Sequence, residues 1–242
     1  MNSLSCAKPL HGDPTCVVFD FDHTLYDGDI SADFLFWVIR RSCVRSCLAT
    51  LASPVLGLML AVRRWRRLGL QCYVWISIFS IKKPRKIDVL VRYYIATHRQ
   101  HIRARLLDQG LAVLEGHVRA GDRVIVASGS LSALIRLVFT RVYRVGVQGI
   151  GSEVMVTKTG KVIVRHCHHS EKVRMLAEHD CTQIGIAYSD SLADLPLLQH
   201  ARRPVVVNPK HRDVSVFREQ LSAATVMVNW GCPSRAGEQT LP

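Results

Sequence analysis

Short apolar runs that alternate with helical patterns are the feature of this sequence that most limits its fold. From Arg123 onward, RVIVAS, IGIAYS and PVVV are typical of buried strands, and SLSALIRLVF, SEKVRMLAEH and LADLPLLQHA are typical of helices between them. Strands separated by helices form a parallel sheet with helices on both faces. An earlier run, residues 16–21, has the same character and is expected to join this sheet.

Two further elements are expected in the same part of the chain. The segment EVMVTKTGKVIV predicts a hairpin that turns at Thr159 and Gly160, and a last helix is expected after Asn208 and Pro209. We therefore predict an α/β core with a discontinuous sequence. The predicted core consists of residues 14–27 and 119–225. A helical insert is predicted for residues 28–118, and tails for residues 1–13 and 226–242.

The insert contains the whole positive excess of the chain. The 242 residues have a formal net charge of +13, and residues 40–103 contain 14 Lys or Arg against one acid, Asp88. The remaining residues therefore sum to zero. We expect the insert to face something anionic, such as nucleic acid, a lipid surface or an acidic partner.

The cysteines and histidines suggest no special framework. The eight cysteines include no CxxC pair, which favours reduced thiols in a cytoplasmic setting over disulfides. The run from His166 to His169 contains metal-ligand residue types, but adjacent side chains point in different directions, so no zinc site is predicted. Residues 1–15 lack an apolar core, so no cleaved signal peptide is expected.

Polar side chains occur at the predicted strand ends and helix starts, where parallel α/β sheets gather their functional groups. A phosphate monoester is doubly negative, so a carboxylate attacks it only when cations and hydrogen-bond donors neutralise the charge. Hard cations such as Mg²⁺ prefer carboxylate and carbonyl oxygens. We expect one site of this kind from the following set: Asp20, Asp22, Ser128, Lys172, Asp190 and Asp194.

This set resembles the four motifs of the haloacid dehalogenase-like (HAD) phosphohydrolases. The matching stretches are DFDHT with Asp20, Asp22 and Thr24, ASGS with Ser128, SEK with Lys172, and SDSLAD with Asp190 and Asp194. The position of the insert resembles that of subfamily IB, in which an all-helical cap follows the first strand. The resemblance implies a HAD-like Rossmannoid core, a helical cap and a phosphatase that works through an aspartyl-phosphate.

The resemblance also implies roles for the residues of the set. Asp20 would be the nucleophile and Asp22 the general acid and base. Magnesium would be held by Asp20, Asp190 and the backbone carbonyl of Asp22. The phosphate would be held by Ser128, by the amides of Gly129 and Ser130 at a helix N-terminus, and by Lys172.

Other positions support the site or depart from the family pattern. Thr24 and Asp194 are expected to support it, with simple helix capping as the alternative for Asp194. His23 and Ser189 stand where the family often has Gly, which concerns loop geometry more than catalysis. His23 either contacts substrate or packs as a surface imidazole.

The insert should decide which substrate enters. Residues 46–62 are 17 consecutive uncharged residues, the lower edge of the length that crosses a bilayer. A single span would put Asp20 and Lys172 on opposite sides of about 30 Å of hydrocarbon. A return span through LGLQCYVWISIFSI would place RRWRR on the far side, against the positive-inside tendency. We therefore expect segments that lie in or dip into the interface, with the following headgroup and interface residues: Arg63, Arg64, Trp65, Arg66, Arg67 and Trp75.

A closer resemblance supports the membrane interpretation. The chain is similar to the phosphatidylglycerophosphatase C type of HAD phosphatase in the combination of DFDHTL, Asp29, an apolar run ending in basic residues, a Trp-containing apolar stretch, HSEKV and YSDSLADLPLL. That type implies an Mg²⁺-dependent enzyme acting on a lipid phosphate at the cytoplasmic face of the cell membrane.

Three alternatives stay open. The cap helices could pack on each other as a soluble cap, in a cytoplasmic enzyme resembling phosphoserine phosphatase. A nucleic-acid surface could use Tyr73, Trp75, Tyr93 and Tyr94, although the long uncharged run argues against it. A phosphate- or nucleic-acid-binding module on a HAD core is the non-enzyme alternative. The oligomeric state stays open as well.

Overall fold

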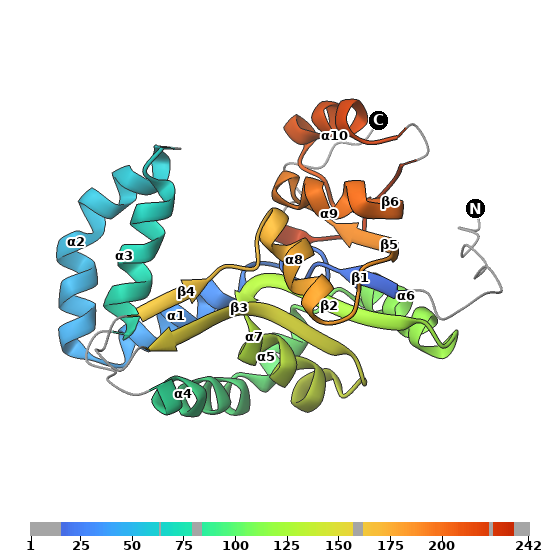
Figure 1. Ribbon diagram of the computed structural model, residues 1–242. Helices are drawn as coiled ribbons and strands as arrows, with labels where there is room; N and C mark the ends of the chain where they lie inside the picture. The colour runs from blue at the N-terminus through green and yellow to red at the C-terminus, as the bar shows by residue number, and fades with distance from the viewer. Residues whose placement is uncertain (1–15, 63, 79–83, 157–161, 223–224, 235–242) are drawn as a thin grey trace.

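The computed structural model describes residues 16–62, 64–78, 84–156, 162–222 and 225–234 and has a seven-stranded sheet at its centre (Figure 1). The spatial order is β4-β3-β2-β1-β5-β6-β7, and all neighbours are parallel except β3 and β4. The predicted parallel sheet and the predicted hairpin pairing are confirmed, while the turn at Thr159 and Gly160 lies outside the described residues. The strands are β1 (Cys16–Phe19), β2 (Arg123–Leu131), β3 (Gln148–Val156), β4 (Val162–Arg165), β5 (Ile184–Ser189), β6 (Ala201–Val207) and β7 (Val226–Val228).

The helices fall into two groups along the chain. Those before β2 are α1 (Ile30–Arg40), α2 (Cys43–Ala61), α3 (Arg66–Ile78), α4 (Pro84–Thr97), α5 (Arg99–Ala104) and α6 (Asp108–Arg119). Those after β2 are α7 (Ser132–Leu137), a π-helical continuation (Val138–Tyr143), α8 (Ser170–Glu178), α9 (Leu195–His200) and α10 (Val214–Gln220). Short 3-10 turns, Leu192–Asp194 and His211–Asp213, precede α9 and α10.

Strand β1 is apolar throughout because both faces of the sheet are covered. Successive side chains of a strand point to opposite faces. Val17 and Phe19 pack in the cluster that includes Leu111 of α6 and Leu134 of α7. Cys16 and Val18 pack in a second cluster, which draws on α8, α9 and α10 through Leu176, Leu198 and Phe217. Such two-sided burial produces a continuous apolar run instead of an alternating one.

The insert divides into a part that joins the core and a part that stands away from it. Phe34 of α1, Tyr94 of α4 and Ile102 of α5 pack in the same cluster as Phe19. Helices α2 and α3 pair with each other as a helical hairpin beside the sheet (Figure 1). Their own small cluster consists of Leu56 and Ile76, together with Ile39 of α1. We call these two helices the α2–α3 lobe.

Two predicted boundaries need correction. Helix α6 packs against β2 and buries Leu111 and Leu114 in the core, so the insert ends before α6 and not at residue 118. Residues 226–234 are also not a tail, because β7 pairs with β6 and Trp230 is buried against Phe19 and Tyr188. The three-residue run VMV was too short to be recognised as a strand from its pattern alone.

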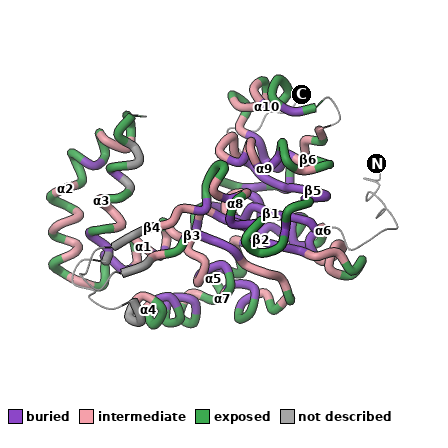
Figure 2. Tube along the Cα trace, viewed as in Figure 1, coloured by how far each residue is buried: buried purple, intermediate pink, exposed green. Residues whose placement is uncertain are grey.

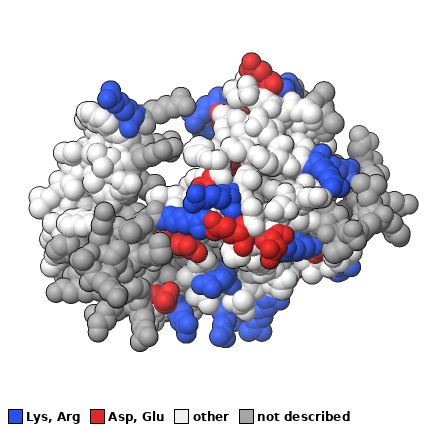
Figure 3. All heavy atoms as spheres, in the orientation of Figure 1, with Lys and Arg blue, Asp and Glu red and all other residues white. Residues whose placement is uncertain are grey.

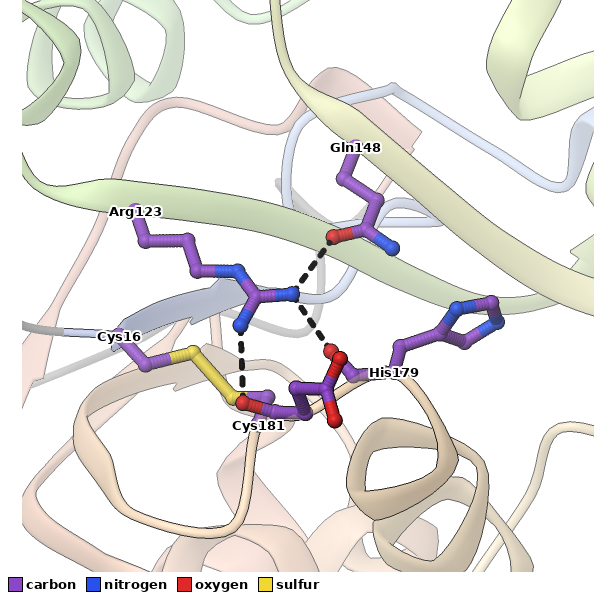
Figure 4. Close-up of a disulfide and its surroundings, with 6 residues drawn as sticks. Cys16, Arg123, Gln148, His179 and Cys181 are labelled. Atoms are coloured by element: carbon purple, nitrogen blue, oxygen red, sulfur yellow. Dashed lines mark hydrogen bonds between the residues drawn. A yellow bond between two sulfur atoms is a disulfide. The ribbon is translucent and has the colours of Figure 1, made fainter.

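The prediction of reduced cysteines is wrong for one pair. Cys16, at the start of β1, and Cys181, in the loop before β5, form a disulfide that closes a sequence separation of 165 residues (Figure 4). Beside it, the Arg123 guanidinium donates to the carbonyl oxygens of His179 and Asp180 at 2.5 and 2.8 Å. The bridge therefore lies at the amino ends of the strands, opposite the edge where the site was predicted.

Candidate active site

A buried lysine joins two carboxylates at the carboxyl edge of the sheet. Lys172, in the first turn of α8, donates from Nζ to Asp20 Oδ1 at 2.8 Å and to Asp194 Oδ2 at 2.7 Å. All three side chains are almost inaccessible to solvent. Burial alone lowers the pKa of Lys172, but the charges of Asp194 and Asp20 outweigh it and raise that pKa. Lys172 is therefore a permanent cation beside the predicted nucleophile.

Asp22 lies in surroundings that favour its protonated form. Its Oδ1 accepts from the backbone N–H of Ile30 at 2.9 Å, and its Oδ2 accepts from the hydroxyls of Ser128 and Ser130, each at 2.7 Å. Burial, followed by the negative charges of Asp29 and Asp20, raises the pKa of Asp22 to about 7. A carboxyl with such a pKa both gives and takes protons near neutral pH, as a general acid and base must.

The loop after Asp22 has a tight backbone at His23, the position where the family often has Gly. His23 has a φ of 58°, the left-handed region that favours glycine, and its N–H donates to the carbonyl of Tyr26 at 2.7 Å. Gly28 has a φ of 123°, and a Cβ there would lie 2.0 Å from the guanidinium of Arg105. The loop then ends at Asp29, which caps α1 by accepting from the N–H of Ala32 at 2.8 Å.

The predicted phosphate-binding residues lie at the end of β2. Ser128 and Ser130 are buried, and the N–H of Ser130 donates to Ser128 Oγ at 2.9 Å. Helix α7 begins only at Ser132, so Gly129 and Ser130 belong to the strand end and not to a helix N-terminus as predicted.

The residues expected around magnesium fit a hard cation. The Thr24 hydroxyl lies 3.4 Å from Asp20 Oδ2 and 3.3 Å from Asp190 Oδ1, so the two buried carboxylates are neighbours. The second oxygen of Asp194, Oδ1, is buried without a hydrogen-bond partner. Among the described residues no three His, Cys, Asp or Glu side chains form a ligand cluster. Two carboxylates plus a backbone carbonyl nevertheless match the oxygen ligands that Mg²⁺ takes, since it usually keeps water and substrate oxygens in its other positions.

The Ser189 hydroxyl explains the other departure from the family pattern. It donates to Asp194 Oδ2 at 2.7 Å and accepts from the N–H of Ser191 at 3.3 Å. A glycine at this position would lack both contacts. This support could not be predicted from sequence, because its partner Asp194 lies in the loop that follows β5.

One cavity of about 450 Å³ contains most of the predicted residues. Its floor includes Asp20, Asp22, Gly129, Lys172 and Asp190. The wall opposite is mainly apolar. The insert contributes Ala32, Phe34, Leu35, Val74 and Ile87, and the strands beside it contribute Leu131 and Val154. A second cavity, of about 560 Å³, lies between α4, α7 and β3 and contains none of the predicted catalytic side chains.

The predicted surface residues of the insert lie away from this floor. Trp65 and Trp75 are half exposed, at 50% and 55%, and Arg64 is exposed as well. Arg63 lies outside the described residues, as do the side chains of Arg66 and Arg67. Figure 3 shows that the described atoms on this face of the α2–α3 lobe are almost free of Lys, Arg, Asp and Glu.

A family model for haloacid dehalogenase-like hydrolases matches residues 17–199, most of the chain. The chain belongs to the haloacid dehalogenase-like hydrolase family. The matched segment runs from β1 to α9 and therefore includes every predicted catalytic residue. The finer resemblance to subfamily IB and to the phosphatidylglycerophosphatase C type stays a prediction.

Solved structures share the fold of this HAD chain at low sequence identity. A protein of unknown function from Bordetella pertussis Tohama I has a TM-score of 0.66 at 19% identity, covering 90% of this chain and 99% of that one. A phosphoserine phosphohydrolase-like protein from Francisella tularensis subsp. tularensis SCHU S4 has a TM-score of 0.55 at 15% identity, covering 92% and 98%. A substrate-bound phosphoserine phosphatase complex has a TM-score of 0.54 at 14% identity, covering 90% and 93%. At these identities the likenesses show a shared fold.

Proposed function

We propose that this HAD enzyme is an Mg²⁺-dependent phosphomonoester hydrolase that removes phosphate from a membrane lipid, with phosphatidylglycerophosphate as the leading candidate. The arrangement of Asp20, Asp22 and Lys172 carries the hydrolase part of the proposal. These residues pair a carboxylate held beside a cation with a second carboxyl of pKa about 7 in the same cavity.

The two carboxyls divide the chemistry between them. Asp20 attacks phosphorus and forms the aspartyl-phosphate, while the bond from phosphorus to the ester oxygen breaks. Protonated Asp22 gives its proton to that leaving oxygen. Asp22 then takes a proton from the water that attacks the aspartyl-phosphate, so that inorganic phosphate leaves and both carboxyls return to their starting states.

The remaining residues neutralise and orient the phosphate. Lys172 offsets the charge of Asp20 and of the incoming dianion. The Ser128 hydroxyl, which donates to Asp22 before substrate binds, and the nearby amides would then donate to phosphate oxygens. Asp20, Asp190 and the carbonyl of Asp22 would hold Mg²⁺, which supplies further positive charge that offsets the phosphate. Thr24 ties the two metal-binding carboxylates together.

The wall of the cavity supports a lipid over a small polar substrate. Of the described insert residues that line it, only Asp29 and Ser31 are polar and none is basic. The described residues of the insert therefore offer no cation there for the carboxylate of a phosphoserine-like substrate, whereas Phe34, Leu35 and Val74 offer contacts for an apolar group. On the core side, Lys210 and Arg212 line the same cavity and suit a second anionic group, such as a phosphodiester.

The α2–α3 lobe supports attachment to a membrane surface. Among the described residues, α2 is the one helix that is long and apolar enough to cross a bilayer, with a mean hydropathy of 1.6. Leu56 is its only buried residue, while Leu51, Val55 and Leu58 are 80%, 64% and 61% exposed (Figure 2). Exposed apolar surface of this extent marks interaction sites. The basic residues that flank it suit an anionic leaflet, so we place the lobe flat in the interface.

A phosphate-release screen tests the substrate. The purified chain is assayed with MgCl₂ on lipid phosphates in mixed micelles, beside phosphoserine, sugar phosphates and nucleotides. We expect preference for phosphatidylglycerophosphate, and loss of all turnover in Asp20→Asn but not in Asp108→Asn, a carboxyl that is 91% exposed. Retained turnover in Asp20→Asn would refute the nucleophile, and a preference for phosphoserine would favour a soluble phosphatase of that type.

Vesicle binding tests the lobe separately from the chemistry. Leu51→Glu changes an exposed position, so the fold should persist while binding to anionic vesicles and lipid hydrolysis fall. Hydrolysis of soluble p-nitrophenyl phosphate should be unchanged. Val226→Glu, at a 54% exposed position of β7, is the matched control. Equal vesicle binding by Leu51→Glu and the unmodified chain would contradict the proposal.

A further inference from the structure

The loop between β4 and α8 places an imidazole over the phosphate-binding strand end. A Cβ added to Gly129 would lie 2.2 Å from Nε2 of His168 and 2.6 Å from its Cε1. The ring edge with Nε2 therefore occupies the space that a side chain at residue 129 would take. His168 also lines the catalytic cavity together with Lys172 and Asp20.

The loop that carries His168 is tied to the same strand end. The Ser152 hydroxyl, from β3, donates to the Gly129 carbonyl at 2.6 Å and accepts from the Cys167 N–H at 3.0 Å. The Ser152 hydroxyl thus joins Cys167, which precedes His168, to Gly129, which lies beneath the imidazole ring. The backbone that carries the imidazole is therefore held beside Gly129 by the fold.

Backbone hydrogen bonds fix the other side of this loop. The N–H of His168 donates to the carbonyl of His166 at 3.0 Å, and the N–H of Glu171 donates to the carbonyl of His168 at 3.2 Å. His169 has a φ of 54°, a left-handed turn that leads directly into α8. Because Lys172 lies in the first turn of that helix, the imidazole and the buried cation are held in one short rigid segment.

We propose that His168 is a further phosphate-binding residue, whose Nε2–H donates to an oxygen of the phosphoryl group held by Ser128, Gly129 and Lys172. The proposal rests on the phosphatase function above and adds a contact that none of the four motifs supplies. Burial and the nearby charge of Lys172 lower the pKa of His168, so the ring is neutral at pH 7 and has one N–H to give.

Inorganic phosphate is the probe that tests this contact, because it needs no knowledge of the leaving group. Its affinity for the full chain with MgCl₂ is measured by calorimetry, and kcat and KM are measured with p-nitrophenyl phosphate. Hydrogen bonds to charged groups are strong, so His168→Ala should weaken phosphate binding and lower kcat/KM by roughly 10- to 100-fold.

Replacing His168 by Gln or Asn keeps a nitrogen near one of the two imidazole nitrogens, which distinguishes a hydrogen bond to phosphate from simple packing. The amide nitrogen of Gln reaches the place of Nε2, whereas that of Asn corresponds to Nδ1. His168→Gln should therefore restore much of the phosphate affinity, and His168→Asn should not. His169→Asn is the control, because this residue is next in the chain and does not line the cavity.

The outcomes separate the two proposals. If the unmodified chain binds phosphate and hydrolyses esters but His168→Ala does both equally well, the His168 contact is refuted and the phosphatase function stands. Equal losses in the Ala, Gln and Asn variants also refute the contact, since packing alone would explain them. If the unmodified chain neither binds phosphate nor hydrolyses any ester, the proposed function itself fails.

Discussion

Replacing Asp22 by Asn should stabilise the protein in a pH-dependent way. The carboxylate costs free energy in the folded state because burial and the charges of Asp29 and Asp20 raise its pKa from 3.8 to about 7. Below about pH 3 the group is almost fully protonated in both the folded and the unfolded chain, so it costs almost nothing. As the pH rises toward 7, the unfolded chain loses this proton first and native stability falls. Above pH 7 the full penalty of about 4 kcal/mol applies.

Asn removes this penalty and still fits the contacts. Its carbonyl oxygen accepts from Ile30, and the hydroxyls of Ser128 and Ser130 rotate to accept from its amide. The gain in unfolding free energy over the unmodified chain should grow from under about 2 kcal/mol at pH 5 to about 4 kcal/mol at pH 8. For a chain of this size, about 4 kcal/mol raises Tm by roughly 8–16 °C.

Urea and thermal unfolding in EDTA measure this gain without interference from bound cations. Asp108→Asn, whose carboxyl is 91% exposed, should change stability by less than about 0.5 kcal/mol at either pH. A stability gain of the same size at pH 5 and pH 8 would show that the Asp22 carboxylate carries no penalty from its surroundings. A less stable Asp22→Asn would refute the reasoning outright.

Two further predictions concern stability. Lys172→Met leaves the buried carboxylates of Asp20 and Asp194 without their cation, so the free energy of unfolding in urea should fall by about 3–5 kcal/mol. A fall below about 1 kcal/mol would contradict the buried ion pairs. Reduction of the Cys16–Cys181 bridge, or Cys16→Ser, should cost roughly 2–5 kcal/mol, because the closed loop is long. Activity should persist, since the bridge lies at the opposite end of β1 from Asp20. Cys43→Ser, at an exposed free thiol, is the control, and identical unfolding with and without dithiothreitol would count against the bridge.

The strand-end chemistry was accessible from the sequence because the residues of the site lie at or just after a strand end, or open a helix. In a parallel sheet those positions meet at one edge whatever the order of the strands. Asp20, Lys172 and Asp190 could therefore be grouped although 152 residues separate the first two. The support around them was not accessible, because Ser189 and Ser152 act through loops whose course depends on the complete fold.

The disulfide shows the limit of the same reasoning. Cys16 and Cys181 have no spacing that marks them as partners, and each lies beside a different strand. They meet because β1 and β5 are neighbours, with Cys16 opposite Ile184. The strand order was not deducible from alternation alone, so neither was the contact. The same dependence on strand neighbours concealed β7, which is only three residues long.

The arrangement of the insert could not follow from periodicity, because a helix that faces lipid and a helix that faces protein both need apolar residues. Helix α4 buries Val91, Tyr94 and Ile95 against the core, whereas α2 buries only Leu56. Leu51 and Val55 on the exposed face of α2 cost free energy in water. Helix α2 packs on α3, which contributes Val74 to the wall of the catalytic cavity. Under the membrane attachment proposed above, a bilayer that covers α2 would bring its own lipids to the mouth of that cavity, and one apolar surface would serve both attachment and substrate supply.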